Sequence, residues 1–202
     1  MRKFLFTLSL IMPFLAFSQT YYAFTEKSSV NLRANPSTNS AKVGSIKKGE
    51  MIAIEDTDDF NWYKTEYNNQ TAYVYAQLVE VCDAVIPTSL YNTEISSVKA
   101  WDRIRVEGTI QITPISSSHA IITMGWMRVN LPYETWNYLA EIKEGRITAT
   151  HQLSPFFLYE GQTLEDILTD DSTSVLSKQI PIGYREFKGT IFFNDATFSL
   201  YK

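Results

Sequence analysis

The chain has 202 residues, of which 45% are hydrophobic and 20% are charged, a balance that argues against global disorder and allows a sizeable buried core. Its formal net charge is −4, which argues against non-specific nucleic-acid binding, because that needs a basic surface facing the phosphates. Phe, Trp and Tyr supply 14% of the residues. This share favours β structure, since aromatic side chains pack well on a pleated sheet.

Residues 1–18 have the features of a secretory signal peptide. Arg2 and Lys3 are basic, residues 4–14 are mostly apolar, and Ala16-Phe17-Ser18 has the small-x-small form that signal peptidase reads. A retained membrane anchor is the alternative, but the apolar run is shorter than the ~20 residues that a spanning helix needs. We therefore expect cleavage after Ser18 and an exported protein in the periplasm or at the cell surface, with no integral membrane span. Loss of Arg2 and Lys3 changes the formal charge from −4 to −6.

Residues 19–82 read as short strands separated by turn residues. A lead-in strand at 20–25 precedes an alternating strand around Val30 and Leu32, which ends at Asn35-Pro36-Ser37. Further strands are expected at 51–54, 61–67 and 71–75, with Gly49 in a left-handed turn and Asn68-Asn69 as a tight turn. The apolar positions that would fill a small barrel are Val30, Leu32, Val43, Ile46, Ile52, Ile54, Val74 and Leu78.

This order resembles the bacterial SH3-like (SH3b) domain, a small barrel found in exported and cell-wall-associated proteins. The residues that carry the resemblance are Val30-Asn31-Leu32-Arg33 with Pro36-Ser37, the Gly49 turn, Trp62-Tyr63-Lys64, and Tyr73-Val74 with Leu78. The sequence departs from the family at Asn69 and Ala72, where members usually carry Gly. The resemblance implies a binding domain without catalysis. In the family, some members recognise peptidoglycan peptides and others tether or orient an attached domain.

A peptide-binding groove is the expected site of this first domain. Its expected lining is Trp62, Tyr63, Tyr73 and Tyr75, with Asn31 and Asp58 nearby. Aromatic rings offer contact area at a low entropy cost, which suits peptide recognition. The alternative is that Trp62 closes the small barrel core and that Arg33 holds a turn. The acidic loop at 55–59 lacks the ligand spacing of a calcium site, so we expect no metal and no cofactor.

Residues 83–96 read as a linker, and residues 97–202 as a β-rich domain of unknown family. Strands are expected at 98–106, 108–113, 120–130, 136–143, 146–152, 189–193 and 197–201. Glu144-Gly145 and Asn194-Asp195 are expected to close hairpins. One short helix is expected from Thr163, whose hydroxyl and Asp166 form a capping-box pattern. The predicted fold class is therefore all-β, with an SH3-like barrel followed by a β-sandwich or open barrel with one short helix.

Cys82 is the only cysteine, so an internal disulfide is excluded. Its place at the end of an apolar strand predicts a buried thiol. The alternative function is a cell-wall hydrolase with a cryptic site of Cys82, His119 and His151, which requires Cys82 to be exposed and within hydrogen-bond reach of a histidine. The segment after Cys82 cannot start the helix that such peptidases place there, so we expect no enzyme.

An apolar run in a Pro-containing loop is the expected partner-binding surface of the second domain. Phe156, Phe157 and Tyr159 lie in this run, and contiguous exposed apolar surface usually marks an interaction site. A third hypothesis is therefore a structural subunit that docks a partner there. The favoured function is an exported, non-enzymatic binding protein whose first domain recognises a peptidoglycan peptide or an envelope protein.

Overall fold

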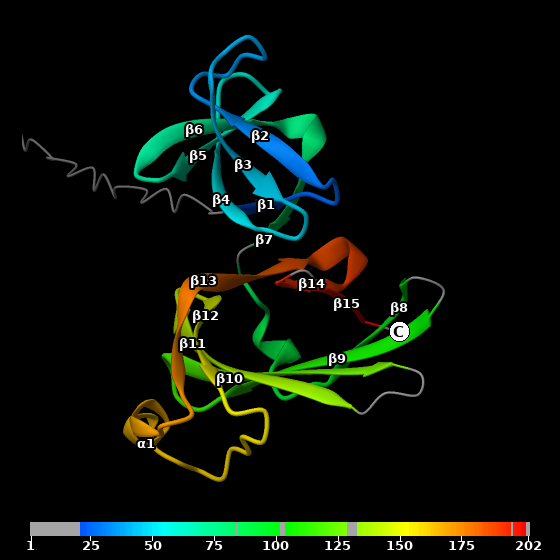
Figure 1. The fold of residues 1–202 in the computed structure, drawn as a ribbon, viewed down its shortest axis with the longest axis vertical. Coiled ribbons are helices and arrows are strands. Elements are labelled where there is room, and N and C mark those ends of the chain that lie inside the picture. Colours follow the sequence, from blue (N-terminus) through cyan, green and yellow to red (C-terminus); the bar gives the residue numbers. More distant parts are fainter. Residues whose placement is uncertain (1–20, 84, 102–103, 129–132, 195, 201–202) are drawn as a thin grey trace, which may run out of the picture.

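The computed structural model describes residues 21–83, 85–101, 104–128, 133–194 and 196–200. The expected signal peptide lies outside these residues. The described chain consists of antiparallel strands with one short α-helix (Figure 1), so the predicted all-β fold class is confirmed.

The N-terminal barrel is built from a coiled antiparallel sheet. Its strands are β1 (Tyr21–Phe24), β2 (Ser29–Arg33), β3 (Lys42–Lys47), β4 (Ile52–Asp56), β5 (Trp62–Tyr67), β6 (Gln70–Tyr75) and β7 (Glu80–Asp83). They are ordered β3-β2-β6-β5-β4-β1-β7. Alternation places Val30 and Leu32 in the core, where they pack with Ile46, Ile54, Ala72 and Val74.

The turns of the N-terminal barrel follow the residue types. Gly49 has a φ of 75°, as predicted. Asn68 and Asn69 have φ values of 51° and 60°, the pair of positive angles that a tight β-hairpin turn needs. Asparagine tolerates this region, so the turn forms without the glycine usual in the family. Ala72 is fully buried in β6, where a small side chain fits against the core.

The second barrel is an antiparallel meander. Its strands are β8 (Ile95–Trp101), β9 (Ile104–Pro114), β10 (His119–Arg128), β11 (Glu134–Lys143), β12 (Arg146–Leu153), β13 (Ser174–Arg185), β14 (Thr190–Phe193) and β15 (Ala196–Ser199). Each strand from β8 to β15 pairs with the next one along the chain. β15 then lies back against β8 and β9, so the sheet curls into an open barrel around one core.

Three sequence-based predictions in this barrel were wrong. The single strand expected at 98–106 is divided between β8, which ends at Trp101, and β9, which begins at Ile104 and pairs antiparallel with β8. The expected strand boundary near Gly108 does not exist, because β9 runs through Gly108 and the ring of Trp126 occupies the space where a Cβ would be. Strand β13 was not expected. Its first half is mostly exposed and it contains Pro181, so it lacks the apolar alternation that marks a strand.

The expected linker, residues 83–96, is packed against the second barrel. Ile86 and Leu90 are buried in the second core, and the Ile86 N–H donates a hydrogen bond to the Gly145 carbonyl oxygen at 3.0 Å. The segment includes a short 3₁₀ turn at Thr88–Leu90. It therefore docks the chain onto the second barrel before β8 begins.

A third cluster of apolar residues joins the two barrels. It contains Phe24, Met51 and Cys82 from the first barrel and Phe192 from the second, and the rings of Phe24 and Phe192 are 4.3 Å apart. β7 also pairs with β13 at Asp83 and Tyr184. In Figure 1, β1 and β7 lie on the side of the first barrel that faces β13 and β14.

The helix α1 (Leu164–Thr169) packs on the outer face of β10, β11 and β12, opposite to the barrel core. The predicted capping box is confirmed: the Asp166 N–H donates to Thr163 Oγ1 at 3.2 Å, and the Thr163 N–H donates to Asp166 Oδ2 at 2.9 Å. Ile167 is buried with Ile121, Leu139 and Leu153 in a small cluster beneath the helix.

Candidate functional site

Strand pairing brings most of the expected ligand-binding residues onto one outer face of the first barrel. Trp62 is opposite Tyr75, Lys64 is opposite Tyr73, and Tyr73 is opposite Arg33. Residues directly opposite one another in a sheet share a face, and so do residues two apart in a strand. We call this surface the aromatic face; it consists of Asn31, Arg33, Trp62, Lys64, Tyr73 and Tyr75.

Within the aromatic face, Trp62 supports Tyr75. The indole is only 5% exposed, and its ring centroid lies 5.2 Å from that of Tyr75 at an angle of 58°. Tyr73 and Tyr75 are half-buried, while Asn31 is exposed. The accessible aromatic surface is therefore provided by the two tyrosines. The buried Trp62 ring packs against Tyr75 and holds its orientation.

Strand pairing does not place the other two expected site residues, Tyr63 and Asp58, on this face. Tyr63 is opposite Val74 and packs against the barrel core, because neighbouring residues in a strand point to opposite sides. Asp58 is exposed in the loop between β4 and β5. That loop is shaped by Asp59, whose Oδ1 accepts a hydrogen bond from the Asn61 N–H at 3.0 Å and whose carbonyl accepts one from the Trp62 N–H at 2.9 Å.

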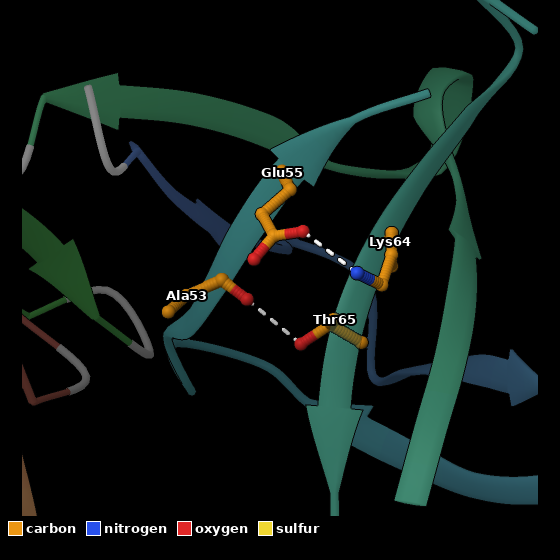
Figure 2. A network of polar contacts seen from close by, with 4 residues as sticks. All are labelled: Ala53, Glu55, Lys64 and Thr65. Carbon is orange, nitrogen blue, oxygen red and sulfur yellow. Dashed lines mark hydrogen bonds and ion pairs between the residues drawn. The ribbon is translucent and has the colours of Figure 1, made fainter. Parts of the chain in front are cut away.

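The two cations of the aromatic face are held by neighbouring groups. Arg33 Nη1 donates to the Ser40 carbonyl at 2.7 Å, so the expected role of Arg33 in holding a turn is confirmed. Lys64 Nζ donates to Glu55 Oε2 at 2.9 Å (Figure 2), and this hydrogen bond raises the pKa of Lys64. Lys64 shares the face of Trp62 because the two residues are two apart in β5. Grouping by aromatic residue type does not reveal this neighbour, whereas strand alternation does.

A polar hollow of about 410 Å³ lies beside this pair, lined by residues of β4, of β5, of the turn that follows β5 and of the start of β6. Figure 2 shows four of the lining residues: next to the Glu55–Lys64 pair, the Thr65 hydroxyl donates to the Ala53 carbonyl at 2.7 Å. This hydrogen bond links β4 to β5 next to the charged pair. The hollow continues the aromatic face with hydrogen-bonding groups.

A second concave site lies where the two barrels meet. It has a volume of about 300 Å³ and is lined by Lys47, Lys48, Gly49, Glu50, Met51, Lys178, Gln179, Ile180, Pro181 and Asn194. Glu50 accepts hydrogen bonds from Lys178 Nζ and from the Lys47 N–H. Burial alone would raise the pKa of Glu50, but these bonds outweigh it and hold the pKa below its ordinary value. The carboxylate is thus already paired.

The three residues of the alternative cysteine site have different surroundings: Cys82 lies among apolar side chains, whereas His119 and His151 are each hydrogen-bonded to a neighbouring hydroxyl. Cys82 is buried, as predicted, in the apolar cluster between the barrels. Burial raises the pKa of its thiol to about 12, with Arg185 acting in the opposite direction. His119 Nδ1 is hydrogen-bonded to Ser118 Oγ at 2.9 Å, and His151 Nδ1 to Thr150 Oγ1 at 2.9 Å. Among the described residues, no three His, Cys, Asp or Glu side chains are grouped for a metal ion.

The expected partner-binding residues differ in exposure. Phe156 is 91% exposed and Tyr159 is 39% exposed. Phe157, which lies between them in sequence, packs against the cluster beneath α1. The segment therefore presents some of its apolar side chains to solvent and uses others as anchors.

Residues 28–80 match the family described as bacterial SH3 domain, which confirms the resemblance recognised in the sequence of the N-terminal barrel. The match runs from the start of β2 to the first residue of β7 and includes every strand of the aromatic face. Neither the curated proteins nor the solved structures gave a match. Within the described residues, no helix is long and apolar enough to cross a membrane.

Proposed function

We propose that this is an exported, non-enzymatic binding protein whose aromatic face recognises a cell-wall peptide or an envelope protein partner. The observation that carries the proposal is the pairing of Tyr75 with the buried Trp62 beside Tyr73 and Asn31. A rigid aromatic surface with a neighbouring amide gives both contact area and a hydrogen-bonding group for a peptide backbone.

Two cationic side chains of the aromatic face offer hydrogen-bond donors to a peptide with free carboxylates. Arg33 and Lys64 flank Tyr73 on either side, since Tyr73 pairs with both residues. Each cation keeps donor groups beyond the one used for Ser40 or Glu55. A peptide that lies across Tyr73 would bring its carboxylates within reach of these donors. Export, which this ligand requires, is supported by the signal-peptide features of residues 1–18.

The arrangement of the barrels is compatible with ligand access. β1 and β7 face the second barrel, whereas the aromatic face is formed by β2, β5 and β6 (Figure 1). A binding role without catalysis is further supported by the environment of Cys82, because a buried thiol with a raised pKa is protonated at neutral pH and the thiolate is the nucleophile.

Sedimentation of the mature protein, residues 19–202, with purified peptidoglycan sacculi tests the proposal. We expect binding that is reduced at least tenfold in Tyr73→Ala and Tyr75→Ala. Tyr159→Ala removes a partly exposed tyrosine from the other barrel and serves as the matched control with unchanged binding.

The same experiment can overturn the proposal. Equal binding by wild type and both face variants would show that the aromatic face is not the site. Muropeptide release that is lost in Cys82→Ala would favour the cell-wall hydrolase. If sacculi are not bound, the cell-wall form of the proposal fails.

A further inference from the structure

The segment that carries α1 and joins β12 to β13 contains acidic residues and no basic ones. Residues 152–177 contain Glu160, Glu165, Asp166, Asp170 and Asp171 and no Lys, Arg or His. All five acidic side chains are exposed. The charged side chains that this segment exposes are therefore all negative.

The same segment exposes large apolar side chains among these acids. Phe156 is 91% exposed, Leu158 72%, Val175 77%, Leu168 43% and Tyr159 39%. We call these five apolar residues, together with the five acidic ones, the cap surface. Large apolar side chains grouped on one exposed segment are unusual unless a partner covers them.

The backbone that carries these exposed apolar side chains is held by several contacts to the barrel and to the helix. Phe157, Leu164 and Ile167 pack against the cluster beneath α1, and the Asn137 side-chain amide donates to the Ser154 carbonyl at 3.0 Å. The Thr173 hydroxyl donates to the Ile167 carbonyl at 2.8 Å, which ties the start of β13 to the helix. The exposed apolar side chains thus alternate with anchored ones on a fixed backbone.

We propose that the cap surface docks a polypeptide segment that presents apolar side chains among lysines or arginines. The apolar groups of such a partner would cover Phe156 and Leu158, and its cations would pair with the carboxylates around them. An anionic lipid surface would be repelled by the same carboxylates. This site is independent of the aromatic face, because α1 lies on the side of the second barrel away from the first (Figure 1).

A second copy of the chain is a poor occupant. In a twofold contact the same patch faces itself, so Glu160, Asp170 and Asp171 of one copy would approach their equivalents in the other. Like charges brought together at an interface oppose association. The charge of the surface therefore selects a different, basic partner.

Binding of three synthetic peptides to the mature protein tests this proposal. The first has Leu and Lys at alternate positions, the second has Glu in place of Lys, and the third has Ser in place of Leu. We expect fluorescence anisotropy to show binding of the first peptide alone. The affinity should fall as NaCl is raised, because exposed charge pairs are screened by salt.

Paired variants locate the site. Phe156→Ser/Leu158→Ser and Asp170→Asn/Asp171→Asn should each lower the affinity for the Leu/Lys peptide at least tenfold. Phe60→Ser removes a 95% exposed phenylalanine from the first barrel, and Glu66→Gln/Glu186→Gln removes the same charge from exposed positions elsewhere; both should bind as wild type. Circular dichroism confirms that each variant is folded.

Several results would overturn the inference. These are equal binding of the Lys and Glu peptides, an equal loss in the control variants, or no binding of the Leu/Lys peptide. Dimerisation that is abolished by Phe156→Ser would assign the surface to a second copy, and flotation with anionic vesicles would assign it to lipid. Sacculus binding through Tyr73 and Tyr75 is measured separately, so failure here leaves the proposed function standing.

Discussion

Cys82 in β7 packs directly against Gly183 in β13, so closely that a Cβ on Gly183 would overlap with the Cys82 sulfur. The two residues belong to different barrels, and Met51 lies on the same side of Gly183, with its sulfur 3.1 Å from the Cβ position. Gly183 is therefore required for the close approach of β13 to the first barrel.

Gly183→Ala should lower the free energy of unfolding by about 1–3 kcal/mol, the usual cost of overpacking. Urea unfolding of the mature protein measures this change. Adding Cys82→Ala should recover part of the loss, because the smaller side chain leaves room for the new methyl group. If the two substitutions are additive, the contact between Cys82 and Gly183 is not the cause.

The Cys82 thiol should resist alkylation in the folded protein and react quickly in denaturant, as followed by mass spectrometry with iodoacetamide at pH 8. Its pKa in the folded state is raised to about 12 from an ordinary value of 9.0, so the folded state holds its proton more tightly. The resulting contribution to stability is present below pH 9 and is lost as the pH rises towards 12. Cys82→Ala should lack this alkaline loss; rapid alkylation of the native protein would contradict the burial.

Arg185 should be a main stabilising residue of the barrel junction. Its Nη1 donates to Glu80 Oε2 at 2.8 Å and its Nη2 to the Val81 carbonyl at 3.1 Å. The guanidinium also lies over the rings of Phe24 and Phe192, at 5.8 Å and 5.7 Å. Arg185→Ala removes these partly buried contacts and should lower the free energy of unfolding, measured in urea, by about 1–3 kcal/mol.

Two further variants make the Arg185 prediction specific. Arg185→Lys should recover only part of the loss, because an ammonium group cannot reproduce the planar fork of a guanidinium. Arg105→Ala breaks an ion pair with Glu107 in which the arginine side chain is 65% exposed, and it should change stability by less than about 0.5 kcal/mol. Equal effects of Arg185→Ala and Arg105→Ala would contradict the assigned role.

Thr163→Ala should open α1 locally, because it removes the hydroxyl that accepts the Asp166 N–H. Amide hydrogen exchange should become faster at Asp166 and Ile167, while Thr163→Ser should exchange like the wild type. Hydrogen bonds from the Thr163 hydroxyl and N–H lower the pKa of Asp166. The stabilisation of α1 by the ionised Asp166 should therefore be fully present above the ordinary carboxyl pKa of 3.8. Protection of the α1 amides from exchange should decrease as the pH falls below that value. Unchanged exchange in Thr163→Ala would contradict the capping role.

Features that depend on local sequence could be predicted well. The Gly49 turn, the Asn68-Asn69 hairpin and the capping box at Thr163 each follow from the preferences of a few adjacent residues. The core positions Val30 and Leu32 follow from strand alternation. The match of residues 28–80 to the bacterial SH3 family agrees with these elements.

Features that depend on distant contacts could not be predicted in the same way. Strand β13 pairs with β12 through its first half and with β14 through its second half, so its sequence carries no single periodic pattern. Gly108 reads as a strand break, although β9 continues through it. The ring of Trp126 occupies the space that a side chain at this position would need. Tyr63 was grouped with Trp62 by residue type, whereas alternation separates the two residues onto opposite faces.

The pairing of Asp83 with Tyr184 makes the two barrels parts of one hydrogen-bonded sheet. A hinge between them would have to break that pairing, separate the rings of Phe24 and Phe192 and release Arg185 from Glu80. These contacts therefore oppose relative motion of the aromatic face and α1. A ligand bound at the aromatic face and a partner bound at the cap surface would therefore be held at a set distance from each other, with the two barrels acting as the spacer.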